Sequence, residues 1–175
     1  MIKPHGSEAL NPLYVADDAK RAELEKEAAG LPSIVISSAA AGNAVMLGSG
    51  YFNPLTGYMN KADALKVAKE MHMTSGLFWP TPVLNMVEDA TAIKDAKRIA
   101  LKDPNVDGNP VLAIMDVEAI EEYTDEEMAM MTQEIYRTDD MEHPGVKAFN
   151  TVGKFGISGS IQVLNYSYFS TDFPD

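Results

Sequence analysis

Few side chains of this 175-residue chain have the type and spacing needed for chemistry, and His143 is the first of them. It follows Asp139 and Asp140 and precedes Pro144 and Gly145. An imidazole near carboxylates can serve as a general acid–base group or a metal ligand. No second histidine is close in sequence, and Pro-Gly is typical of a turn. We therefore expect a structural role, in which hydrogen bonds of His143 fix a loop, or a role at a domain interface.

A run of glycines is the second pattern that could bind a ligand. Gly153, Gly156 and Gly159 have spacings that can cradle a phosphate group. A phosphate loop opens a helix, whose first N–H groups hold the anion. Here residues 161–164, Ile-Gln-Val-Leu, are typical of a strand. We predict a hairpin turn at the glycine run, lying between two short strands of the region 148–169.

The sequence gives little support for metal or thiol chemistry. An acidic run at residues 118–127 supplies hard oxygen ligands, but it lacks the spacing of a calcium-binding EF-hand. We interpret it as a solvated surface. Cysteine is absent, which excludes disulfides, thiolate metal sites and cysteine nucleophiles. We predict no catalytic, cofactor-binding or metal-binding residue in this chain.

The charge balance also limits the possible partners. The net charge is −12, and only three arginines are present, scattered at Arg21, Arg98 and Arg137. Such a chain repels nucleic acid and lacks the convergent cations of an anion-binding active site. No apolar run reaches the roughly 18 residues of a membrane span, and no apolar signal core follows Met1. We expect no nucleic-acid or membrane partner and a cytoplasmic location.

Periodicity and capping signals predict the elements that position these residues. Short strands interleaved with helices, with prolines interrupting one strand, indicate an α+β fold with a small, partly closed barrel. The clearest helix is 124–137, where Thr124 and Glu127 form a capping box. Helices are expected at 17–30, 39–47, 61–72 and 124–137, and strands at 34–36, 77–87, 98–102 and 111–117.

The most distinctive segment is 48–59, which combines three glycines, a proline and three aromatic residues. Its composition predicts a buried connecting loop. The segment also resembles the Gly-Phe-x-Pro-Leu-x-Gly-Phe-Met signature of ATP sulfurylases (sulfate adenylyltransferases). The matching residues are Gly50, Phe52, Pro54, Leu55 and Gly57.

Three later segments resemble the same family, in the same order. They are Leu77–Val83, with Trp79 between Leu77 and Pro80, then Leu101–Pro110, and then Tyr136–Val146, which holds His143, Pro144 and Gly145. The Gln-x-Arg-Asn and His-x-x-His motifs of the family's catalytic domain do not occur in this sequence. The resemblance covers essentially the whole chain. It implies that residues 1–175 are a single N-terminal PUA-like domain and that this chain does not include the catalytic nucleotidyltransferase domain.

The resemblance implies both a fold and a function. The fold would be a PUA-like pseudobarrel of short mixed strands decorated by helices. The whole enzyme would interconvert ATP and sulfate with adenosine 5′-phosphosulfate and pyrophosphate, with ATP and sulfate as substrates and no cofactor in this chain. This domain alone would be inactive and would brace the catalytic domain in an enzyme that can form a homo-oligomer. A stand-alone PUA-like binding or regulatory module is the alternative.

Several residues are candidates for contact with the missing domain. The aromatic side chains Tyr51, Phe52, Tyr58 and Trp79 could form an apolar patch that this domain would cover. The structural or interdomain candidates from the family motifs are Gly50, Phe52, Pro54, Leu55, Gly57, Trp79, His143, Pro144 and Gly145.

Overall fold

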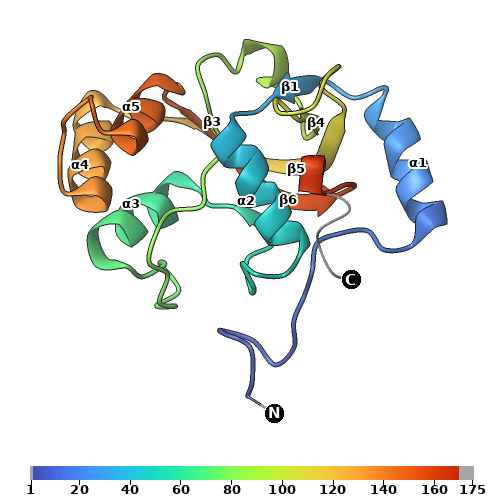
Figure 1. The fold of residues 1–175 in the computed structure, drawn as a ribbon, viewed down its shortest axis with the longest axis horizontal. Helices are drawn as coiled ribbons and strands as arrows, with labels where there is room; N and C mark the ends of the chain where they lie inside the picture. The colour runs from blue at the N-terminus through green and yellow to red at the C-terminus, as the bar shows by residue number, and fades with distance from the viewer. Residues whose placement is uncertain (1, 170–175) are drawn as a thin grey trace.

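A six-stranded mixed sheet forms the centre of the computed structural model, which describes residues 2–169 (Figure 1). The strand order is β1-β4-β5-β6-β2, and β3 also pairs with β6. Only the β1–β4 pair is parallel. The strands are β1 (Ser33–Val35), β2 (Gly57–Tyr58), β3 (Met86–Val87), β4 (Arg98–Lys102), β5 (Val111–Glu122) and β6 (Phe155–Val163).

Side-chain caps set the starts of the helices. Asp17, Ser37, Asn60 and Thr124 each accept a hydrogen bond from a backbone N–H in the first helical turn, and Thr124 forms the predicted capping box. The four predicted helices are confirmed. The helices are α1 (Asp18–Ala28), α2 (Ser38–Gly48), α3 (Lys61–Glu70), α4 (Asp125–Tyr136) and α5 (Pro144–Thr151), with 3₁₀ turns η1 (Thr91–Ile93) and η2 (Ser167–Phe169).

Helix α2 crosses the middle of the sheet, with α1 toward one end and α4 and α5 toward the other (Figure 1). It is rich in alanine, and its small side chains let it lie close to the strands. Ala40, Ala44 and Leu47 belong to the main core together with Ile99 and Val163. A second core joins α3 and α4, and a third joins α1 to β4 and β5, so the two ends of the sheet have separate apolar packing. The α+β class is thereby confirmed.

The predicted hairpin turn at the glycine run is wrong. Residues 155–163 form one continuous strand, β6, and residues 144–151 form helix α5. Two glycines of the run serve close backbone packing instead: a Cβ on Gly153 would lie 2.1 Å from the carbonyl oxygen of Val87, and a Cβ on Gly159 would lie 2.0 Å from that of Asp116. On the other side of β6, a Cβ on Gly57 would lie 1.9 Å from the carbonyl oxygen of Gly159. A glycine run therefore occurs here because two neighbouring backbones approach β6.

Two smaller expectations also need correction. Within 77–87 only Met86 and Val87 form a strand, because the two prolines cannot donate to a ladder. The strand expected at 34–36 is shifted by one residue to Ser33–Val35, and Val35 is 51% exposed at the sheet edge. The mixed sheet is open, with β1 and β2 at the ends of the strand order among residues 2–169, which agrees with an α+β fold whose barrel is at most partly closed.

A matched pair of glycine substitutions tests this packing. Gly57→Ala should lower the free energy of unfolding by about 3 kcal/mol, because the new methyl group would overlap the β6 backbone. Gly42→Ala should raise it by about 1 kcal/mol, because Gly42 is an exposed position of α2 with open space around it. Urea unfolding monitored by circular dichroism measures both. Equal effects of the two substitutions would contradict the account.

Candidate functional site

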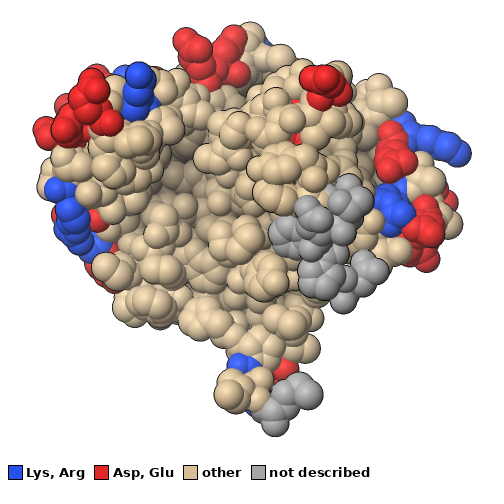
Figure 2. All heavy atoms as spheres, viewed as in Figure 1, with Lys and Arg blue, Asp and Glu red and all other residues tan. Residues whose placement is uncertain are grey.

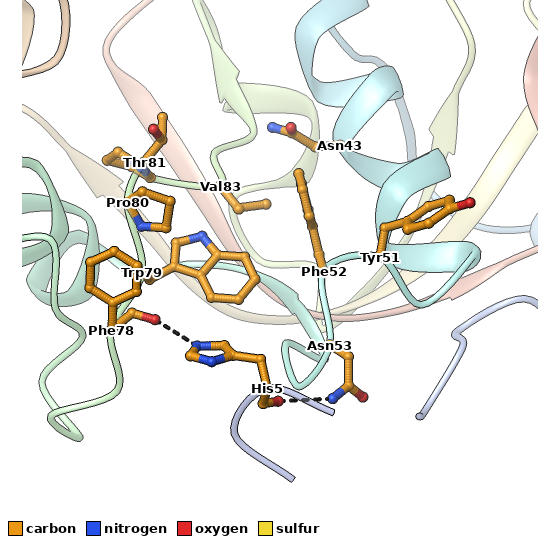
Figure 3. Close-up of a pocket in the computed structure, with 11 residues that line it drawn as sticks. His5, Asn43, Tyr51, Phe52, Asn53, Phe78, Trp79, Pro80, Thr81 and Val83 are labelled. Carbon is orange, nitrogen blue, oxygen red and sulfur yellow. Dashed lines mark hydrogen bonds between the residues drawn. The ribbon is translucent and has the colours of Figure 1, made fainter. Parts of the chain in front are cut away.

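An open cavity of about 520 Å³ lies between the N-terminal arm, the loop after α2 and the segment 78–83 (Figure 3). The rings of Phe52 and Trp79 meet edge to face inside it, with centroids 5.7 Å apart and planes at 88°. Tyr51 stands at its mouth and is 65% exposed, whereas Trp79 is 7% exposed. The cavity therefore brings together three of the four aromatic residues expected in an apolar patch.

Tyr58, the fourth aromatic residue, was wrongly assigned to that patch. Its side chain is only 4% exposed, and its hydroxyl donates a hydrogen bond to the carbonyl oxygen of Ala40 at 2.7 Å. Burial raises the pKa of Tyr58 far above its ordinary value. It is therefore a neutral core residue that ties β2 to α2.

Asn53 holds the N-terminal arm beside the cavity. Its side-chain amide nitrogen donates to the carbonyl oxygen of His5 at 3.1 Å and to the hydroxyl of Ser7 at 2.6 Å, and its amide oxygen accepts from the backbone of Asn11 at 3.0 Å. Nε2 of His5 in turn lies 2.8 Å from the carbonyl oxygen of Phe78 (Figure 3). The arm thus forms one wall of the cavity, which the sequence did not indicate.

A second cavity of about 390 Å³ adjoins the first. The two share Asn43, Thr81 and Pro82 in their walls, and Tyr136 and Phe149 line the far side of the second. The rings of Tyr136 and Phe149 have centroids 6.1 Å apart. Partial burial raises the pKa of Tyr136 above its ordinary value, so this hydroxyl is also neutral near pH 7.

The predicted trio His143, Pro144 and Gly145 opens helix α5 instead of forming a turn. Nδ1 of His143 accepts a hydrogen bond from the backbone N–H of Val146 at 3.3 Å, and Pro144 occupies the first helical turn. A Cβ on Gly145 would lie 2.6 Å from Cε1 of Tyr136, so glycine is needed where α5 meets α4. Gly145 lines the second cavity. Within residues 2–169, His143 makes no hydrogen bond to a carboxylate side chain.

The remaining candidates shape the loop and do not line either cavity. Gly50 has a positive φ of 81° and lies against Pro12, and Pro54 lies against Gly6 of the arm. Leu55 is buried in the main core, and Gly57 pairs with β6. Their roles toward another domain stay predictions.

Neither cavity has a charged side chain in its walls, although 23% of the chain is Asp, Glu, Lys or Arg. Figure 2 shows this face: the charged residues lie at its margins, and the hollowed middle is free of them. Within residues 2–169 no group of three or more His, Asp or Glu residues could hold a metal ion. The site is suited to contact with apolar surface, and its walls offer no cation for a phosphate or sulfate group.

A model of the PUA-like domain family matches residues 2–166. The chain belongs to this family.

Relatives of this PUA-like domain include two bacterial sulfate adenylyltransferases. The chain is 59% identical over all 175 residues to the protein of Alcanivorax borkumensis and 58% identical to that of Allochromatium vinosum. It spans 44% of the length of each. Among solved structures, a hexameric APS kinase from Thiobacillus denitrificans matches with a TM-score of 0.64 and 25% identity, covering 100% of this chain and 28% of that one.

The sequence could not predict the contact of Asn53 with the N-terminal arm or the wall that the two cavities share. Asn53 and the arm are 42 to 48 residues apart, and no local pattern marks their contact. The shared wall of Asn43 and Thr81 depends on how α2 lies against the segment 78–83.

Within residues 2–169 no helix is long and apolar enough to cross a bilayer.

The role of Asn53 can be tested with Asn53→Asp, which keeps the size and the acceptor but loses two donated hydrogen bonds. The arm should open more often, and chymotrypsin should cleave after the exposed Leu10 about 10-fold faster, as followed by mass spectrometry. Ser7→Ala removes one bond only and should have a smaller effect. An unchanged cleavage rate in Asn53→Asp would show that Asn53 does not hold the arm.

The cap of α5 can be tested separately. His143→Ala should lower the free energy of unfolding by about 1 kcal/mol, because the N–H of Val146 loses its acceptor. His143→Asn should retain most of the stability, because asparagine is a good cap. If asparagine proves as damaging as alanine in urea unfolding, the capping role is refuted.

Proposed function

We propose that this chain is the N-terminal, non-catalytic domain of a sulfate adenylyltransferase. That enzyme interconverts ATP and sulfate with adenosine 5′-phosphosulfate and pyrophosphate. The observation that carries the proposal is the 59% identity to the Alcanivorax borkumensis enzyme over all 175 residues of this chain, which covers 44% of that enzyme's length. A match of this extent fits one domain of a longer protein.

The walls of the two cavities offer no lysine or arginine for the reaction itself. Transfer to the α-phosphorus of ATP needs cations or N–H groups that stabilise charge on phosphate and sulfate oxygens. The three arginines are engaged elsewhere: Arg21 pairs with Asp18, Arg98 pairs with Glu27 and Asp116, and Arg137 pairs with Glu134. These pairs lie outside both cavities. The reacting groups would therefore belong to the second domain.

The role that follows for this domain is mechanical support. Catalysis by alignment of two substrates depends on accurate positioning, and a rigid neighbouring domain helps to keep the catalytic domain in place. We propose that this domain braces the catalytic domain, needs no cofactor of its own, and works in the cytoplasm within an enzyme that can be a homo-oligomer. ATP and sulfate would be substrates of the whole enzyme only.

A chimera tests this proposal directly. The matching region of the Alcanivorax borkumensis enzyme would be replaced by this chain, and pyrophosphate release from ATP would be measured with and without sulfate. We expect the chimera to keep activity within about 10-fold of the parent, because its parts come from the same kind of enzyme. The 175-residue chain alone should release no pyrophosphate above a blank.

Two outcomes would refute the proposal. A folded chimera without sulfate-dependent activity would show that this chain cannot serve as that domain. Sulfate-dependent activity of the isolated chain would show that it is catalytic, against the proposed supporting role.

A further inference from the structure

The two adjoining cavities form one uncharged groove, in which Asn43, Thr81 and Pro82 are the shared wall. Two of its aromatic side chains are well exposed, Tyr51 at 65% and Phe78 at 48%. An apolar face that excludes charge is unusual in a chain with a net charge of −12. Such a composition is typical of the centre of a stable protein interface, where charged residues are depleted and aromatic residues enriched.

The position of the last described residues points to what covers the groove. Tyr166 stacks on Tyr14 with ring centroids 4.5 Å apart. Tyr166 also lines a cavity together with Pro12 and Ser49. Ser49 is two residues from Tyr51 at the mouth of the groove. Tyr166, three residues before the last described residue, therefore lies near the rim of the groove.

The length of the relatives supplies a covering segment of sufficient size. The chain corresponds to 44% of the two sulfate adenylyltransferases, so more than half of such a protein lies outside it. A segment that continues from beside the rim needs no long linker to reach the groove. The absence of charge also fits a permanent contact within one chain better than an encounter steered by charge.

We propose that the part of the enzyme that follows this domain binds in the uncharged groove, with Tyr51, Thr81 and Phe78 at the contact. This inference rests on the function proposed above. The groove face then becomes an internal surface of the whole enzyme, and the aromatic side chains at its mouth become buried anchors. The mechanical support given to the catalytic domain would pass through this face.

The test places a charge in the groove of the chimera. Tyr51→Lys and Thr81→Lys are suitable because both side chains are exposed in the isolated chain. Ala22→Lys is the matched control, since Ala22 is exposed on α1, which lies away from the groove (Figure 1). In the isolated chain, all three variants should melt within about 2 °C of the parent.

In the chimera, each groove variant should lower kcat/KM by about 10-fold or more, because a buried lysine would displace the catalytic domain. Each should also separate thermal unfolding into two transitions, whereas Ala22→Lys should retain the parent's activity and single transition. If both groove variants behave like Ala22→Lys in an active chimera, the inference is refuted and the proposed function stands. If the unsubstituted chimera is folded but inactive, the proposed function itself fails.

A second copy of this chain is the competing occupant of the groove. Sedimentation of the isolated chain would then show a dimer that Tyr51→Lys dissociates, while the chimera would tolerate the same substitution. That combination would overturn the inference. The inference would be supported if the isolated chain is a monomer and the groove variants of the chimera lose activity and unfold in two transitions.

Discussion

The fold depends on the close approach of three backbones at Gly159 in β6. Gly159 has a φ of 144° and leaves no room for a side chain next to Asp116 of β5, and Gly57 of β2 leaves none next to Gly159. The register of β5 shifts between Val117 and Ala119, beside this contact. Glycine at both positions is therefore a steric requirement, and it allows one strand to pair with β5 along its length and with β2 and β3 on its other side.

This central strand also places the walls of the groove. The loop that holds Tyr51, Phe52 and Asn53 runs directly into β2, and the segment 78–83 leads into β3. The N-terminal arm is fixed to the same strand, since Val15 donates to the carbonyl oxygen of Val163. Three segments distant in sequence are thus held around one cavity by their attachment to β6. The groove is a consequence of the sheet pairing and not of any local motif.

The elements with local signals could be predicted from the sequence. The capping box of Thr124 fixed the start of α4, and the strands expected at 98–102 and 111–117 are β4 and the first part of β5. The glycines of β6 were misinterpreted because glycine marks a turn and a close backbone contact equally well. The helix that His143 caps was missed, because Pro-Gly also fits a turn. The contact between Asn53 and the arm depends on tertiary structure alone.

The family signature and the groove overlap only in part. Phe52 and Trp79 line the first cavity and Gly145 the second, whereas Leu55 and Gly57 serve the core and the strand pairing. The resemblance to sulfate adenylyltransferases thus combines residues that maintain the fold with residues that face outward. Hydroxyl-radical footprinting of Tyr51 and Phe78, in the isolated chain and in the active chimera, tests the central claim most directly. The account predicts several-fold lower oxidation of both side chains in the chimera, with exposed Val35 unchanged. Equal oxidation of Tyr51 and Phe78 in the two proteins would contradict it.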